Sequence, residues 1–69
     1  MTKQELKKNM KVWSAAAHRH LYYTGIEFDK QGYNLKTKDY TPRHVFRFVD
    51  ICDAIFDFEA DELKYLEVK

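Results

Sequence analysis

The segment from residue 45 to residue 58 is the most apolar part of the chain, and it limits how the rest can fold. Read as a helix, in which successive side chains are about 100° apart, its apolar residues cover an arc of about 240°. A helix that covers one side of a core needs an apolar stripe of only about 100° or slightly more. Thr41 as N-cap and Pro42 at the first helical position favour a helix start there. We therefore predict a second helix from Thr41 to about Phe58 that is covered on two sides.

The N-terminal part of the chain shows a different periodicity. Thr2 followed by Glu5 has the spacing of a capping box, which marks a helix start. Gly25 stands where a helix commonly ends. Between them, apolar residues recur at intervals of three and four, the spacing of one helical face. These are Leu6, Met10, Trp13, Ala17 and Leu21, followed by Thr24. The pattern predicts a long amphipathic helix over residues 3–24.

The segment between these two predicted helices changes period again. Ile26 and Phe28, then Tyr33 and Leu35, alternate with polar residues on either side of a turn over residues 29–32 that contains Gly32. This alternation predicts a short β-hairpin.

The C-terminal segment allows two interpretations. Asp61 is a suitable cap for a short third helix that carries Leu63 and Leu66, whereas residues 64–69 also alternate as a strand beside the hairpin would. We favour the helix. The predicted fold class is therefore α+β: a long N-terminal helix, a short β-hairpin, a second apolar helix, and a short C-terminal helix or strand.

Length and composition predict one small domain over residues 1–69. The chain is 45% hydrophobic and 16% aromatic, with one cysteine, so its composition is globular and an intramolecular disulfide is excluded. We expect Cys52 to be buried as a small hydrophobic residue. A lone thiol without a signal-peptide pattern predicts a cytoplasmic protein, and no apolar run approaches the length of a membrane span.

The charges divide the chain into a basic and an acidic part. Residues 1–47 carry a formal charge of +6, and residues 48–69 carry −5. On the predicted second helix, three aspartates a turn apart leave one polar stripe within the apolar surface. We hypothesise that this acidic face binds a basic surface of another protein, and that exposed tyrosines supply contact area. The acidic residues are Asp50, Asp53, Asp57, Asp61 and Glu62, and the tyrosines are Tyr22, Tyr23, Tyr33 and Tyr40.

The basic part supports an alternative hypothesis. Cations interleaved with hydroxyl and aromatic groups on the first predicted helix are suited to phosphate contact and base stacking. The alternative function is therefore a nucleic-acid-binding module that uses the first helix and the connector over residues 36–43. Its residues are Lys7, Lys8, Lys11, Arg19, Lys36, Lys38 and Arg43.

The wide apolar arc of the second helix also predicts self-association. The arc could be covered within the monomer, by the first helix, the hairpin and the C-terminal segment, or by the same helix of a second copy. Because a chain of this size has little with which to cover 240° of a helix, we favour a homodimer with an isologous interface. Its predicted interface residues are Phe46, Phe48, Ile51, Ile55 and Phe58.

The sequence contains no recognisable catalytic arrangement. His18 and His20 are about 200° apart on a helix and cannot chelate one metal together. Nucleotide-binding, metalloprotease and thiol-redox motifs are absent from the sequence. We predict no enzymatic activity, no cofactor and no metal. The length, the dense aromatics and the predicted helix–hairpin–helix order are similar to those of small accessory or inhibitory proteins of mobile elements, which implies a small regulator or inhibitor.

Overall fold

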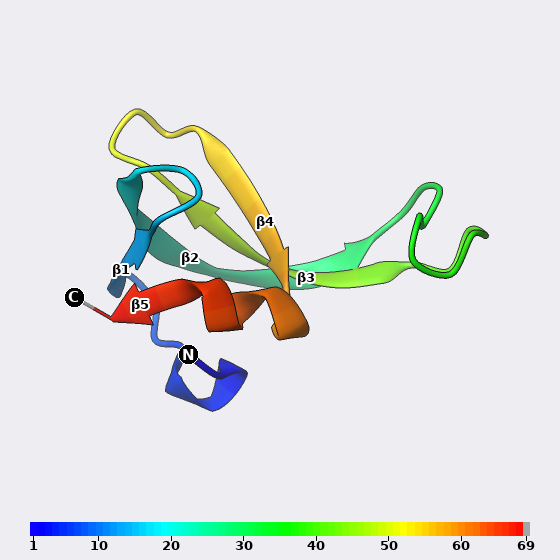
Figure 1. Cartoon of the computed structure of the whole chain (residues 1–69), viewed down its shortest axis with the longest axis horizontal. Coiled ribbons are helices and arrows are strands. Elements are labelled where there is room, and N and C mark those ends of the chain that lie inside the picture. The colour runs from blue at the N-terminus through cyan, green and yellow to red at the C-terminus, as the bar shows by residue number, and fades with distance from the viewer. Residues whose placement is uncertain (69) are drawn as a thin grey trace.

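The structure, a computed structural model, describes residues 1–68 and shows one five-stranded antiparallel sheet (Figure 1). The strand order is β4-β3-β2-β1-β5. Two 3-10 helices accompany the sheet, and within residues 1–68 there is no α-helix. The elements are η1 (Lys3–Glu5), β1 (Lys11–Ser14), β2 (Arg19–Lys30), β3 (Arg43–Val49), β4 (Ile55–Glu59), η2 (Ala60–Tyr65) and β5 (Leu66–Val68).

The predicted α+β fold is therefore wrong, and the first predicted helix is the clearest correction. The Thr2–Glu5 pair forms as expected, because the Thr2 N–H and hydroxyl both donate to the Glu5 carboxylate, but the helix that follows is the three-residue η1. Residues 11–14 and 19–23 alternate between the two faces of the sheet, with Val12 opposite Leu21 and both fully buried. The three-and-four spacing of apolar residues was a by-product of this alternation on either side of a turn.

The turn between β1 and β2 replaces the middle of the predicted helix. The Ser14 hydroxyl accepts a hydrogen bond from the Ala17 N–H at 3.2 Å, and His18 adopts a left-handed conformation with φ of 54°. Alanines favour helices, yet the preference is small for each residue and is overridden by the pairing of the two strands. The sequence from Ala15 to His18 therefore reverses the chain.

The second predicted helix is instead the β3–β4 hairpin. Phe46 pairs with Phe58 and Phe48 with Phe56, so these four rings share the inner face. Arg47 lies opposite Asp57 on the outer face. Phenylalanine and β-branched residues fit the pleated surface of a sheet. In two successive strands, apolar side chains recur at every second residue, and this spacing covers a wide arc when the segment is plotted as a helix. The width of that arc therefore came from the hairpin.

Asp50 organises the turn between β3 and β4. Its Oδ1 atom accepts hydrogen bonds from the N–H groups of Cys52 at 2.8 Å and Ala54 at 2.9 Å. Its Oδ2 atom receives Arg19 Nη1 at 2.8 Å, which connects this turn to the start of β2. Asp53 completes the turn with φ of 64°. The Asp50 side chain, which was predicted to face a partner protein, is thus buried between the β1–β2 turn and the β3–β4 turn.

A long arm formed by β2 and β3 extends away from the rest of the sheet (Figure 1). The β2–β3 pairing shifts register between Tyr23 and Glu27, around Gly25, whose φ is 83°. The first strand of the predicted hairpin exists within β2, but Tyr33 and Leu35 lie in the loop beyond it instead of in its partner strand. In that loop, the side-chain oxygen of the buried Asn34 accepts hydrogen bonds from the backbone N–H groups of Lys36 and Thr37.

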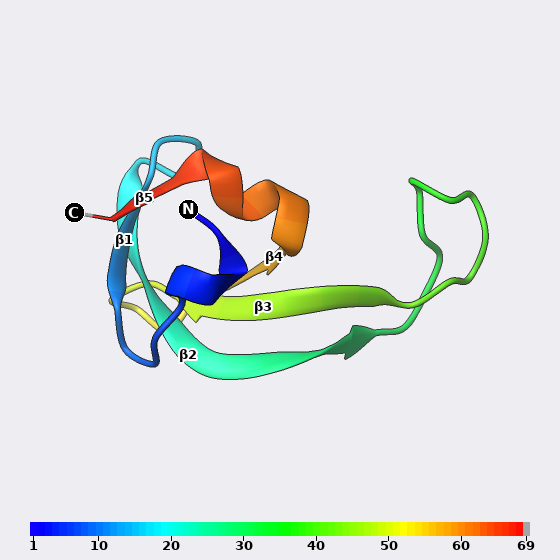
Figure 2. The ribbon, with the colours of Figure 1, turned by 90° about the horizontal axis from the view of Figure 1, so that it is seen from below.

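The C-terminal segment combines both predicted alternatives. Residues 60–65 form η2, and β5 follows, pairing with β1 and not with the predicted hairpin. Figure 2 shows η2 over the concave side of the curved sheet, and Leu63 and Leu66 enter the core from there. Lys69, the end of the predicted strand, lies outside the described residues.

The core occupies this concave side. Its buried residues are Val12, Leu21, Tyr23, Phe46, Phe48, Leu63 and Leu66. Two residues of the predicted dimer interface, Phe46 and Phe48, are therefore buried within one chain, and Phe58 packs beside them. Ile51 and Ile55 are exposed. The apolar surface that suggested self-association thus packs largely inside the single chain. Within residues 1–68, no helix has both the length and the apolar character needed to cross a membrane.

We predict that Asp50 has a larger effect on stability than its neighbour Asp53. Asp50→Asn keeps the side-chain size but removes the charge that strengthens the hydrogen bonds from Arg19 and the turn. We expect its unfolding midpoint to fall by several degrees in differential scanning fluorimetry. Asp53→Asn removes the same charge in the same turn, where asparagine tolerates the left-handed conformation, and should unfold close to the unsubstituted protein. Equal losses in both variants would contradict this role of Asp50.

Candidate functional site

The acidic residues that were predicted to form one binding face do not share a surface. Asp50 is buried, and hydrogen bonds from the Ala54 N–H and from Arg19 lower the pKa of its carboxyl group. Asp57 lies on the outer face of β4, where Arg47 donates to it at 2.9 and 3.1 Å. This guanidinium, with a further contribution from Lys30, lowers the pKa of Asp57. Both carboxylates are therefore already neutralised by cations of the same chain.

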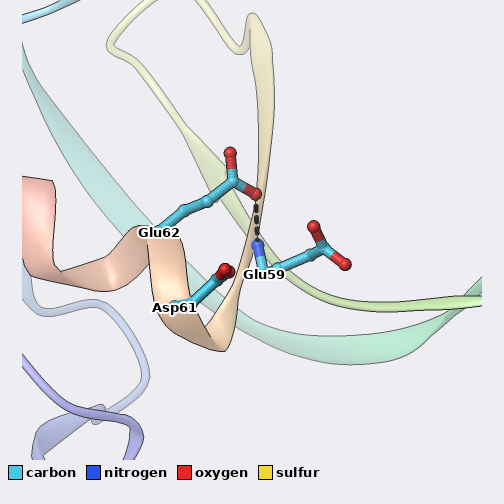
Figure 3. Close-up of side chains that lie close together, drawn as sticks. All are labelled: Glu59, Asp61 and Glu62. Atoms are coloured by element: carbon cyan, nitrogen blue, oxygen red, sulfur yellow. Dashed lines mark hydrogen bonds between the residues drawn. The ribbon is translucent and has the colours of Figure 1, made fainter. Parts of the chain in front are cut away.

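Asp53 lies in the β3–β4 turn, whereas Asp61 and Glu62 gather with Glu59 at the start of η2 (Figure 3). Carboxylate oxygens of Glu59, Asp61 and Glu62 all lie within 4.8 Å of one another. Lys36 Nζ lies 2.6 Å from Glu59 and 3.1 Å from Asp61, and this contact raises the pKa of Lys36 and lowers that of Asp61. Arg43 approaches Glu59 at 3.5 Å and Glu62 at 3.6 Å.

Two cations thus occupy the space between these three carboxylates. A metal ion at this position would have to displace both Lys36 and Arg43. The group functions as an ion-pair network that fastens the loop of the arm to η2. Of the five predicted acidic residues, only Asp53 lacks an ion pair within residues 1–68.

The four predicted tyrosines separate into three environments. Tyr23 is buried in the core. Tyr22 is half-buried on the outer face of β2. Tyr33 and Tyr40 come together in the loop of the arm, with ring centroids 5.4 Å apart in an edge-to-face arrangement and with exposures of 52% and 74%. Only the last two form a common exposed surface.

Among the basic residues of the alternative hypothesis, Arg19 is paired with Asp50 at 2.8 Å, and the other six divide into two groups. Lys36 and Arg43 belong to the arm and are paired as described above, and Lys38 lies in the same loop. Lys7, Lys8 and Lys11 lie together where the chain enters β1, beside the middle of β2. The backbone N–H of Asn9 donates a hydrogen bond to the Tyr23 carbonyl at 2.7 Å, which attaches this segment to β2.

The three N-terminal lysines differ from the arm cations in their charge environment. Lys7, Lys8 and Lys11 are exposed, and within residues 1–68 none of them has a carboxylate partner. Lys3, Lys38 and Lys64 also have no ion pair within residues 1–68, but Lys7, Lys8 and Lys11 form the group of three that lies just before and at the start of β1.

Of the three lysines, Lys11 lies on the outer face of the sheet, beside aromatic side chains. Tyr22 lies opposite Lys11, and Trp13 lies opposite His20. The Trp13 and His20 rings meet edge to face with centroids 5.0 Å apart. All three aromatic side chains are partly exposed. We call Lys7, Lys8, Lys11, Trp13, His20 and Tyr22 the lysine–aromatic face.

Two members of this face were missed by the sequence analysis. Trp13 was predicted to lie on the apolar face of the first helix, and His20 was not assigned to a binding surface. The available signal was the alternation on either side of the β1–β2 turn, which places Trp13 and His20 on the face opposite Val12 and Leu21. The Nδ1 atom of His20 is buried and has no hydrogen-bond partner within residues 1–68, so packing against Trp13 positions the ring.

A cleft of about 370 Å³ adjoins the lysine–aromatic face. It lies between the β1–β2 turn and the β3–β4 turn, and both turns supply its walls. Its lining residues are His18, Arg19, His20, Tyr22, Asp50, Ile51 and Cys52. The prediction that Cys52 is buried is wrong, since the cysteine is exposed at this cleft. No motif in the sequence indicated that these two turns meet.

Comparison with known proteins gives no functional assignment. No protein-family model matches the chain, and searches of curated proteins and of solved structures find no significant similarity. The function must therefore be inferred from the surfaces described above.

We predict that His44 on the arm titrates above its ordinary pKa of about 6.5. Its Nδ1 lies 2.8 Å from Asp29 and its Nε2 lies 3.3 Å from Glu27, and these carboxylates raise its pKa. The stabilisation is present below the unfolded-state pKa and is lost as the pH rises through the folded-state pKa. NMR titration of the His44 ring should show this shift, and Asp29→Asn should reduce it. Asp39→Asn, which removes the same charge elsewhere on the arm, should leave the His44 midpoint unchanged.

Proposed function

We propose that the protein is a non-enzymatic module that binds single-stranded nucleic acid through the lysine–aromatic face. The observation that carries this proposal is the distribution of unpaired charge. Cations of the same chain compensate most of the acidic residues in the second half of the chain, whereas Lys7, Lys8 and Lys11 remain exposed and unpaired within residues 1–68. The surface available to a charged partner is positive, which favours a polyanion.

The arrangement of the cations and rings supports a single strand in particular. Lysines supply contacts to phosphate that do not depend on sequence. Aromatic rings on the same face offer stacking platforms for bases, each worth about 1–3 kcal/mol. Bases can stack on protein rings only where they are unpaired, so Trp13, His20 and Tyr22 would contribute little to binding a duplex. The outer-face side chains of β1 and β2 are exposed or partly exposed, so an extended strand could reach them.

The arm supports a second candidate function, which is binding to another protein. Tyr33 and Tyr40 form an exposed pair, and Leu35 beside them is 81% exposed. Tyrosine and other large apolar side chains are suited to interface anchors. The acidic residues no longer add to this candidate, because they are paired within the chain. The nucleic-acid function therefore has the stronger support.

We predict salt-dependent binding of a labelled oligo(dT) of about 10 nucleotides, a length within the range that small single-strand-binding folds cover. With contacts from three lysines, the slope of log K against log salt should be about −2, since each phosphate contact on a single strand contributes roughly −0.7. Lys7→Gln combined with Lys11→Gln should reduce the slope to about −0.7 and weaken binding. Fluorescence anisotropy across a salt series measures both quantities.

A matched variant separates this surface from the effect of net charge. Lys38→Gln combined with Lys64→Gln removes the same charge from the arm and from η2, away from the lysine–aromatic face. This variant should bind like the unsubstituted protein. Equal weakening in both double variants would show that the protein's total charge controls binding and would exclude the proposed surface. Unchanged anisotropy at low salt would reject the function itself.

A further inference from the structure

We propose that the cleft between the β1–β2 and β3–β4 turns accepts one unstacked nucleobase of the bound strand. This inference rests on the proposed function and identifies a specific site within it. The cleft and the lysine–aromatic face are continuous, because His20 and Tyr22 belong to both. A strand that stacks along the outer face of β1 and β2 therefore reaches the cleft at the end nearer the two turns.

The size of the cleft suits a small planar group. Its volume of about 370 Å³ is near the lower end of the range of roughly 300–1,000 Å³ found for small-molecule sites. Tyr22 is the tyrosine among the residues that line the cleft. Ile51, which is 88% exposed, offers an apolar contact from the β3–β4 turn. Apolar walls with a few fixed polar groups are the usual composition of a small-molecule site.

Arg19 supplies a preorganised polar group at this position. Its Nη1 donates to Asp50 at 2.8 Å and its Nε donates to the Ala17 carbonyl at 3.0 Å, so the guanidinium plane is fixed from two sides. The side chain is nevertheless 52% exposed, its guanidinium lies 5.9 Å from the centre of the Phe56 ring, and Arg19 is one of the residues that line the cleft. A guanidinium has five N–H donors, so further donors remain for a base oxygen or nitrogen or for a phosphate. Because the chain already holds the side chain, binding would not have to order it.

The cleft also contains its own reporter, since Cys52 is the only cysteine in the chain and is exposed on the cleft wall. A base in the cleft should shield this thiol from iodoacetamide. At an oligo(dT) concentration of about ten times Kd, the alkylation rate should fall about tenfold, because the rate follows the unoccupied fraction. An abasic strand of the same length keeps the phosphates but lacks the bases. It should leave the alkylation rate unchanged at the same fraction of protein bound.

Substitution of an exposed residue tests the cleft without disturbing the core. Ile51→Glu places a carboxylate at the cleft, so oligo(dT) should lose its protection of Cys52 while the salt dependence of binding persists. Leu35→Glu makes the equivalent change at a similarly exposed residue of the arm and should retain full protection.

The outcomes separate the two proposals. Unchanged alkylation when anisotropy shows oligo(dT) to be bound would overturn the base site and leave the lysine–aromatic face in place. Protection by thymidine monophosphate without protection by the strand would assign the cleft to a free nucleotide and would also overturn this inference. Absence of strand binding at low salt would reject the proposed function and the base site with it.

Discussion

The carboxylate of Asp50 connects the β3–β4 turn to the start of β2. It accepts two N–H groups from the β3–β4 turn and receives Arg19 from the start of β2. Buried carboxylates are tolerated when hydrogen bonds and a cation compensate their charge. Here that requirement fixes the distance between two turns. The cleft, the orientation of the Arg19 guanidinium and the exposed position of Cys52 all follow from it, so one compensated charge shapes the site as well as the fold.

The two halves of β2 differ in how well they are supported by other parts of the chain. Its first half pairs with β1 and covers the core, whereas its second half pairs only with β3 in the arm. Few buried side chains support the arm beyond Phe46 and Val45, and its loop is fastened to η2 by Lys36 and Arg43. Exposed ion pairs of this kind contribute about 0–1 kcal/mol each. The lysine–aromatic face lies at the opposite end, where β1 and the first half of β2 cover the core.

The sequence predicted local features better than the pairing of segments. The Thr2–Glu5 contact, the strand containing Ile26 and Phe28, and a short helix carrying Leu63 were foreseeable, because each depends on neighbouring residues. Leu66, predicted in the same helix, lies in β5. The helices were wrong because Val45, Phe46, Phe48 and Val49 fit a helical spacing and a strand alternation equally well. Only the partner strand decides between them. The pairing of β1 with β5 joins the two ends of the chain and leaves no signal in either segment. The cleft could not be predicted for the same reason.

The charge asymmetry of the sequence acquires a different meaning in the folded protein. A basic first part and an acidic second part suggested two opposed binding faces, but five of the ten basic residues in residues 1–47 pair with acidic residues of the second part in the fold: Arg19, Lys30, Lys36, Arg43 and Arg47. The lysines beside β1 are among the cations that have no such pair within residues 1–68, on a chain whose formal net charge is only +1. Long-range attraction of a polyanion is therefore weak, and three phosphate contacts lose much of their effect at physiological salt. A useful affinity would then have to come from the bases, through stacking on Trp13, His20 and Tyr22, which are aromatic groups that salt does not screen.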